Sequence, residues 1–512
     1  MRFTRSLSLA ASSAALLAFA SPAILVASKH PQYGGTLRLE LQMSKVSFDP
    51  REWKPGSVAS AQNAKLAALL FDRLLILDAY GRFQPALALD WSHDAAFKVW
   101  QFKLRPGVKF SDGSTLVPKD VVASLQPLFP QGLQIAAAES AVTIRSLHPV
   151  PDLLEQLASG RYFIFRSQSN EPPIGTGPFI LAESLPPAAA EGNPSVLKPA
   201  RIKFRANEDC WSGRPFLDAL EITLGNPPLR QILNLQVGRT DVIDIPPELV
   251  HKARQDNLRV WSSQAATLLA LRFDDAQPAA SNPLLREALD LSLDRDTMAN
   301  VLLQRQALPA PALLPQWLSG YAFLFGTSVN LDRAKQIRAG LPANIAAGTA
   351  PLRLSVDAPG DLLKLLGERV AVNARQANIS VQPIPRPSSS STNPVSPTAG
   401  LHLFAWHYDS LSPQTELANF ARAFHLTPAP DTATDMQDPE KLYAAEQKLL
   451  QDREVLPLLL LPDYLGIAPA VRNWSASPSG EWRIADVWID TGDSPSNSGN
   501  AQSRNPAPGV HP

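Results

Sequence analysis

The chain has 512 residues, of which 45% are hydrophobic, with 47 basic (Lys and Arg) and 47 acidic (Asp and Glu) side chains. That length predicts two or three lobes, and the apolar content excludes a largely disordered chain. The balanced charge excludes the strongly basic proteins that bind nucleic acid or an anionic membrane surface. The single cysteine, Cys210, cannot form an internal disulfide.

The N-terminus has the pattern of an export signal. Arg2 and Arg5 precede an apolar run rich in Ala and Ser, and Ala18-Phe19-Ala20 fits the small-x-small cleavage rule. The run is too short to hold a membrane span stably, although an uncleaved anchor is the alternative. We therefore expect a cleaved signal over residues 1–20, with a second candidate cut at 28, and export to a bacterial periplasm.

The next predicted elements are strands with one buried face. Apolar and polar residues alternate in 34–42 and again in 98–104. A helix is predicted from Pro118, because proline suits a first turn, and Asp120 then lies near the positive end of the helix dipole. Further along, strands are predicted at 219–225 and 239–245, with a helix at 228–238 between them.

Strands and amphipathic helices alternate in the second half of the chain. A strand at 266–274 precedes a helix at 283–293, and Asp294 is placed to cap another helix at 295–304. The remaining predictions are helices at 331–340, 360–378 and 438–452 and strands at 379–384 and 455–461. This alternation predicts an α/β protein with crossover connections.

Low-complexity pieces separate these elements. Residues 185–195 and 386–400 are rich in Pro, Ser and Ala and are predicted to be mobile surface loops. The tail at 491–512 has little to bury and is predicted to be disordered.

Several motifs occur in the order known from one protein family. The chain carries DRLLILDAYGRFQPALALDWS, VWQFKLRPGVKFSDGSTLVPKDVVASL, GTGPFIL, ANEDCWSGRPFLDALEITL, LQVGRTDV, NPLLREALDLSLDRDTMANVLLQRQALPAPALLP and WHYDSLSP. Together these motifs resemble family 5 of the bacterial extracellular solute-binding proteins, the peptide- and nickel-binding components of ABC importers. The resemblance extends from about Gly34 to Trp474.

The resemblance implies an α/β, two-lobed periplasmic-binding-protein fold of type II, with an extra subdomain on lobe I and a ligand cleft between the lobes. The solute closes the lobes by binding the closed form more tightly. The boundaries that we expect are lobe I at 30–55, 170–262 and 471–490, the extra subdomain at 56–169, and lobe II at 263–470.

The resemblance also implies partners and a biochemical role. The expected solute is a small molecule, most simply a di- to oligopeptide, and the expected protein partner is an ABC permease at the inner membrane. We expect a monomer without catalytic residues, cofactor or resident metal, and no nucleic-acid partner.

The chain departs from the family pattern at four places. Val117 replaces a helix-capping Ser or Thr, and Asn378 replaces a helix-ending Gly, which Asn can imitate in the left-handed conformation. Ser412 replaces the second acid of the family motif that contains Asp409. The segment 128–163 is shorter than usual, which predicts a trimmed subdomain.

The candidate ligand-binding residues come from the segment LFAWHYDSLSP. In peptide-binding relatives the acid at the position of Asp409 pairs with the ligand's N-terminal ammonium, and a carboxylate in a dry cleft gives such a cation a strong charge-assisted bond. The neighbouring Trp406, His407 and Tyr408 are expected to line the pocket, since aromatic faces attract cations. For Trp406 the alternative is a tryptophan packed in the core. The alternative is that Asp409 caps the following turn.

Arg272 is the candidate partner for a ligand carboxylate, because it lies in the strand that lines the cleft in the family. An exposed strand position is the alternative for this arginine.

The sequence carries weaker signals for other functions. If residues 401–409 stay extended, His407 and Asp409 share a face suited to chelation, but no third metal ligand is evident nearby. A metal chelate or haem remains open as cargo. Ser195 and Lys198 spell the Ser-x-x-Lys motif of penicillin-binding enzymes but fall in a predicted loop bracketed by prolines, which disfavours a hydrolase. A periplasmic sensor would keep the same fold.

Overall fold

The structure is a computed structural model. It describes residues 30–490 except 79–80, 169–170, 191–192, 275–276, 322–324, 327, 343–350, 357–360, 385–398, 427–437 and 478–479. The predicted signal peptide, the tail and most of the 386–400 loop therefore lie outside the described residues.

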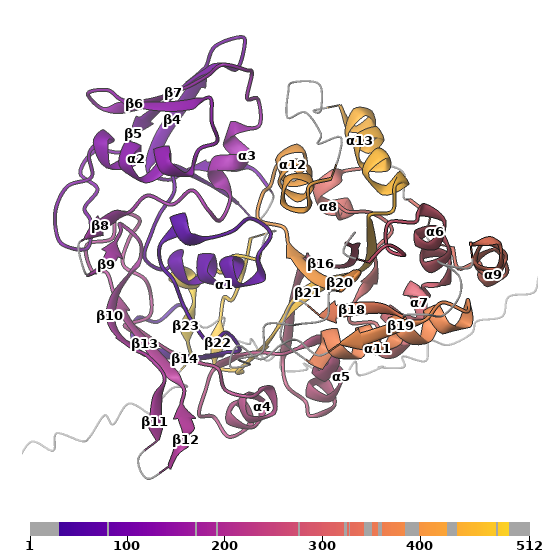
Figure 1. Cartoon of the computed structure of the whole chain (residues 1–512). Coiled ribbons are helices and arrows are strands. Elements are labelled where there is room, and N and C mark those ends of the chain that lie inside the picture. Colours follow the sequence, from indigo (N-terminus) through magenta and orange to yellow (C-terminus); the bar gives the residue numbers. More distant parts are fainter. Residues whose placement is uncertain are drawn as a thin grey trace, which may run out of the picture.

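A mixed sheet of eleven strands runs through both halves of the protein (Figure 1). Its strand order is β10-β13-β14-β1-β15-β21-β16-β20-β18-β19, and β17 pairs with β21 off this path. The strands are β1 (Thr36–Leu41), β10 (Phe179–Leu185), β13 (Ala200–Ala206), β14 (Ala219–Leu224), β15 (Val242–Asp244), β16 (Val260–Phe273), β17 (Leu308–Pro309), β18 (Leu352–Val356), β19 (Val381–Ile384), β20 (Leu401–His407) and β21 (Val455–Ile467).

Two long antiparallel strands, β16 and β21, join the halves. Their pairing runs from Val260 opposite Gly466 to Arg272 opposite Val455, with irregular register between Ser262 and Thr267. On one side of this irregularity β21 contributes to a core with β1, β13 and β14, which we call the lobe I core. On the other side β16 and β21 contribute to two cores with β18, β20 and their helices, which we call the lobe II cores.

Helices cover the sheet in both lobes. Lobe I and its neighbourhood contain α1 (Val58–Ala67), α4 (Pro228–Gln236) and α5 (Pro247–Gln255). Lobe II contains α6 (Pro283–Ser292), α7 (Arg295–Thr297), α8 (Gln316–Ser319), α9 (Leu331–Gly340), α11 (Asp361–Gln376), α12 (Pro413–Phe424) and α13 (Pro439–Gln451). Short 3-10 turns are η1 (Pro50–Glu52), η2 (Gln126–Leu128) and η5 (Ile484–Asp486).

A small four-stranded sheet with its own core lies beside lobe I. Its order is β4-β5-β7-β6, formed by β4 (Ala88–His93), β5 (Val99–Leu104), β6 (Leu133–Ala137) and β7 (Ala141–Ser146). With α2 (Pro118–Leu125) and α3 (Leu153–Ala158) it buries a separate apolar cluster. Figure 1 shows α3 facing α12 of lobe II. The predicted lobe and subdomain boundaries stay a prediction.

The remaining strands form two-stranded sheets. They are β2 (Leu75–Leu77) with β3 (Phe83–Pro85), β8 (Arg166–Gln168) with β9 (Glu171–Ile174), β11 (Ala188–Ala190) with β12 (Asn193–Lys198), and β22 (Val471–Arg472) with β23 (Trp488–Ile489).

Most predicted elements are confirmed, and the capping details explain their ends. Although Val117 offers no capping side chain, Asp120 accepts a hydrogen bond from the Val117 backbone nitrogen at 2.9 Å, which supplies half of a capping box. Asn378 adopts a φ of 57°, so it ends α11 in the left-handed conformation as expected. Ser412 is the N-cap of α12 and accepts a hydrogen bond from the Thr415 nitrogen.

One prediction is wrong, and another is only partly right. The 185–195 segment is not simply a loop, because β11 and β12 pair as an antiparallel hairpin arm that includes Ser195 and Lys198. The helix predicted at 295–304 is only α7 followed by a π-helical turn, η3 (Met298–Leu302). The positive φ angles of Gln304 and Arg305 end it there, because an α-helix cannot continue through left-handed residues.

Candidate ligand site

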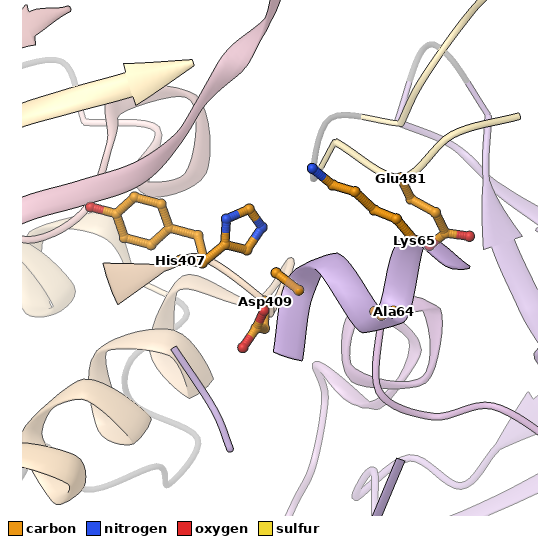
Figure 2. A pocket seen from close by; sticks show the side chains of 8 residues that line it. Ala64, Lys65, His407, Asp409 and Glu481 are labelled. Atoms are coloured by element: carbon orange, nitrogen blue, oxygen red, sulfur yellow. The ribbon is translucent and has the colours of Figure 1, made fainter. Parts of the chain in front are cut away.

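A partly open pocket lies where β20 ends against α1, between lobe I and lobe II (Figure 2). Figure 2 shows His407 of β20 and Lys65 of α1 extending toward the space between them. The lining residues are Ala61, Ala64, Lys65, Gly160, His407, Tyr408, Asp409 and Glu481.

The middle and last turn of α1 form one wall of the pocket. The helix begins at Ser57, whose side chain accepts a hydrogen bond from the Ser60 nitrogen. Ala61, Ala64 and Lys65 follow at helical spacing and therefore share a face. The two alanines have short apolar side chains, so Lys65 is the polar group that α1 supplies to the pocket.

Lys65 is held by an acid on the strand that joins the lobes. Its Nζ lies 2.5 Å from Oδ2 of Asp463 on β21. Burial raises the pKa of Asp463, but the charges of Lys65 and His407 outweigh burial and hold that pKa below its ordinary value. The Asp463 nitrogen bonds to Ser263 Oγ at 2.8 Å, within the irregular part of β16.

His407 is the last residue of β20 and is buried. It pairs with Thr267 of β16, whose Oγ1 lies 3.2 Å from His407 Nδ1. Its backbone nitrogen donates to the carbonyl of Gly56, just before α1, at 2.8 Å. The end of β20 thus contacts the chain of lobe I through the main chain.

Asp409 lies beside the same glycine. The Gly56 nitrogen donates to Asp409 Oδ2 at 2.7 Å. Burial raises the pKa of Asp409 to about 7, against the lowering effects of the Gly56 hydrogen bond and the Arg161 charge. A carboxylate in this setting gains most from a cationic partner, because a positive charge offsets the cost of its dehydration.

Trp406 and Tyr408 belong to a lobe II core instead. Tyr408 is 0% exposed, and its hydroxyl donates to the Leu313 carbonyl at 2.6 Å. The Trp406 ring packs against Phe420 with centroids 5.0 Å apart. Tyr408 is one of the residues that line the pocket, whereas the Trp406 ring lies directly against Gly56.

Glu416 on α12 is a second buried acid that the sequence reasoning missed. Its two carboxylate oxygens accept hydrogen bonds from Trp406 Nε1 at 2.6 Å and from the Ser410 nitrogen at 2.9 Å. Burial and the neighbouring Asp409 raise its pKa to about 8. Its sequence signal is an acid four residues after the cap Ser412, which many exposed helix starts share.

The structure places Arg272 outside this group. Along the β16–β20 pairing, Thr267 opposes His407 and Arg272 opposes His402, five residues farther on. At the rise per residue of a β-strand, these five residues span roughly 16 Å. Arg272 forms an ion pair with Asp274 at 3.1 Å, and its side chain is 27% exposed.

A metal centre has no counterpart in the part of the chain that the structure describes, where no three His, Cys, Asp or Glu side chains gather as ligands. His407 and Asp409 both line the pocket, as an extended segment predicts, and they supply two such groups.

Comparisons with known proteins agree with the motif resemblance. A family model described as bacterial extracellular solute-binding proteins, family 5 Middle, matches residues 82–426. Di/tripeptide-binding protein 2 of Pseudomonas aeruginosa is 26% identical over 352 residues, covering 60% of this chain and 62% of that protein. The nickel-binding protein NikA of Staphylococcus aureus is 22% identical over 367 residues, covering 68% of this chain and 69% of that protein. The match thus spans less than two thirds of the Pseudomonas protein.

Among solved structures, the ABC transporter-associated periplasmic binding protein DppA from Helicobacter pylori in complex with peptide STSA has a TM-score of 0.72 to this chain. The sequence identity is 16%, and the match covers 90% of this chain and 99% of that one. The predicted two-lobed α/β fold is confirmed. Within the described residues, no helix has the length and apolar character needed to cross a membrane. The chain belongs to family 5 of the bacterial extracellular solute-binding proteins.

Proposed function

We propose that the chain is the substrate-binding component of an ABC importer and that it captures a small peptide between its lobes. The observation that carries the proposal is the placement of Asp409, a largely buried carboxylate on the pocket wall between the lobes. A peptide ammonium has three donors and a full charge, so it suits this acid better than a neutral ligand does. The names of relatives that bind di- and tripeptides support the same class of solute.

The neighbouring main chain supports a peptide rather than an isolated amine. The His407 nitrogen, at the end of β20, donates to the Gly56 carbonyl of lobe I. A ligand that carries a carbonyl next to its ammonium could bond to both groups at the end of the strand, as in strand addition. We propose that the protein acts as a monomer in the periplasm after removal of its signal peptide, delivers the peptide to a membrane permease, and does not catalyse a reaction.

A metal chelate is the second candidate, because His407 and Asp409 share the pocket and the relative NikA is named for binding nickel. Two protein ligands leave the rest of the coordination to the chelator, so this cargo would be a complex rather than a bare ion.

Native mass spectrometry of the gently purified mature protein tests both candidates, followed by calorimetric titration with di- and tripeptides. We expect a peptide mass on the wild type and its loss in Asp409→Ala. N-acetylated peptides, which lack the ammonium, should not bind. Asp209→Asn, at an acid whose side chain is 77% exposed, is the matched control and should bind like the wild type. A metal-bearing mass would favour the chelate, and tight binding of acetylated peptides would contradict the role of Asp409.

A further inference from the structure

Gly56 makes two main-chain hydrogen bonds to the pocket end of lobe II. Its nitrogen donates to Asp409 Oδ2 at 2.7 Å, and its carbonyl accepts from the His407 nitrogen at 2.8 Å. Gly56 lies in the short connection between η1 and α1, on the lobe I side. One residue of the chain therefore bonds both to the last amide of β20 and to the acid that follows this strand.

These two bonds match what the first residue of a peptide would make. Such a residue presents an ammonium for a carboxylate and, two atoms further, a carbonyl for a backbone N–H. Resting on the function proposed above, we infer that Gly56 occupies the position of the ligand's first residue and that a bound peptide displaces it. The site thus contains a competitor built from its own chain.

The close approach requires glycine. Gly56 has a φ of +73°, a conformation that side-chain-bearing residues rarely adopt. A Cβ atom at this position would lie 2.2 Å from Cε3 of Trp406, far closer than two carbon atoms can approach without a bond. Trp406 cannot easily yield, because its Nε1 is bonded to buried Glu416 and its ring packs on Phe420.

The hydrogen bond from Gly56 to Asp409 is also weak enough for a peptide ammonium to replace it. The Gly56 N–H is a neutral donor, whereas a peptide ammonium brings a charge, and charge-assisted hydrogen bonds are roughly twice as strong as neutral ones. The internal contact keeps Asp409 hydrogen-bonded when no cation is present, so it lowers the cost of burying that acid. The same contact weakens the apparent affinity for peptide, because part of the population has its site filled.

A second contact between the lobes provides a control. Asp152, at the start of α3, accepts hydrogen bonds from Ser412 Oγ at 2.5 Å and Thr415 Oγ1 at 2.8 Å, both at the start of α12. None of these three residues lines the pocket. A peptide would not replace this contact, and its removal leaves both Gly56 bonds to lobe II in place.

Gly56→Ala and Asp152→Ala are compared with the wild type by small-angle scattering and by titration with a di- or tripeptide that the wild type binds. Without peptide, we expect Gly56→Ala to be more expanded than the wild type, and Asp152→Ala to be less expanded than Gly56→Ala because it keeps both Gly56 bonds. Gly56→Ala should bind the peptide about ten-fold more tightly, the order expected when two neutral backbone hydrogen bonds stop competing. Asp152→Ala should bind no more tightly than the wild type. Equal or weaker binding by Gly56→Ala would overturn the inference.

Hydrogen exchange on the unmodified protein covers the case in which Gly56→Ala does not fold. Saturating peptide should speed exchange of the Gly56 amide, which loses its acceptor, while the end of β20 becomes more protected. Slower exchange at Gly56 would overturn the inference and leave peptide capture intact. A wild type that binds neither peptides nor acetylated peptides would overturn the proposed function and this inference with it.

Discussion

The Gly56 nitrogen lies 2.7 Å from Asp409 Oδ2, although 353 positions separate the two residues in the sequence. This bond joins the segment before α1 to the end of β20, and it fixes the hydrogen-bonding state of the acid on which the proposed function depends. Because Asp409 is buried with a neutral donor, its charge is poorly compensated and its pKa lies near 7. The binding and stability of the protein should therefore respond to pH in the neutral range.

Peptide affinity should rise as the pH increases from 5.5 toward 7.5. The cation needs an ionised Asp409, whose pKa of about 7 leaves much of it protonated at the lower pH. Above about pH 8 the affinity should fall again, because the peptide's own amino group loses its proton near 7.7–8.0. Titration calorimetry at half-unit pH steps measures this profile.

Asp409→Asn is the control for that profile, since it removes the titrating group while keeping an acceptor for the Gly56 N–H. Its residual binding should lack the rise below pH 7.5. A wild-type affinity that stays constant from pH 5.5 to 7.5 would contradict the proposed pairing of Asp409 with a cation.

The free energy of unfolding, measured without peptide, should fall as the pH rises from about 5 to 8. Burial raises the folded-state pKa of Asp409 and of Glu446 to about 7 and that of Glu416 to about 8, whereas the unfolded chain has ordinary values of 3.8 or 4.5. In this window the folded state holds more protons than the unfolded state, so stability decreases with increasing pH. Urea denaturation at pH 5, 6, 7 and 8 checks the sign, and Glu416→Gln, which stays neutral, should flatten the slope.

Local periodicity was enough to predict most helices and strands and one feature of the site, whereas the two-lobed arrangement was implied by the family resemblance. In an extended segment alternate residues share a face, so His407 and Asp409 were expected together. The structure brings both to the pocket, while the Trp406 ring packs in a lobe II core. For Trp406 the sequence left a pocket wall and a core position open, and the ring takes the core position.

The rest of the site depends on contacts between distant segments. Lys65, Gly160 and Glu481 line the pocket with Asp409. No local sequence pattern indicates that any of these three residues lies near the end of β20. Gly56 likewise has no signal beyond the Pro-Gly turn that contains it. Tertiary packing alone decides that its backbone, and not a side chain, meets Asp409.

Glu416→Ala should destabilise the protein by about 2–6 kcal/mol. Glu416 is 1% exposed and accepts from Trp406 Nε1 and the Ser410 nitrogen, so its loss leaves two buried donors unpaired, each costing about 1–3 kcal/mol. Glu368→Ala is the control at an exposed position of α11 and should change stability by less than about 0.5 kcal/mol. Urea unfolding at pH 7 compares them, and equal midpoints for the two variants would show that Glu416 has no supporting role.

The ion pair between Lys65 and Asp463 should show strong coupling in a double-mutant cycle. Their charged atoms are 2.5 Å apart, and the side chains are 10% and 31% exposed. Lys65→Met leaves a largely desolvated Asp463 without its nearest cation, and we expect a loss of about 1–3 kcal/mol, below the 3–5 kcal/mol of a fully buried pair because Asp463 retains contact with water. The double variant with Asp463→Leu should cost less than the sum of the single changes.

A double-mutant cycle at an exposed ion pair provides the reference value for the coupling energy between Lys65 and Asp463. Lys203 and Glu221 are 3.8 Å apart on the surface, with side chains 47% and 48% exposed, and such pairs contribute at most about 1 kcal/mol. Coupling between Lys65 and Asp463 should exceed that of the surface pair, because α1 and β21 hold the first pair with less water around it. If the two coupling energies are equal, Lys65 is screened by solvent, and Asp463 does not hold α1 against the strand that joins the lobes.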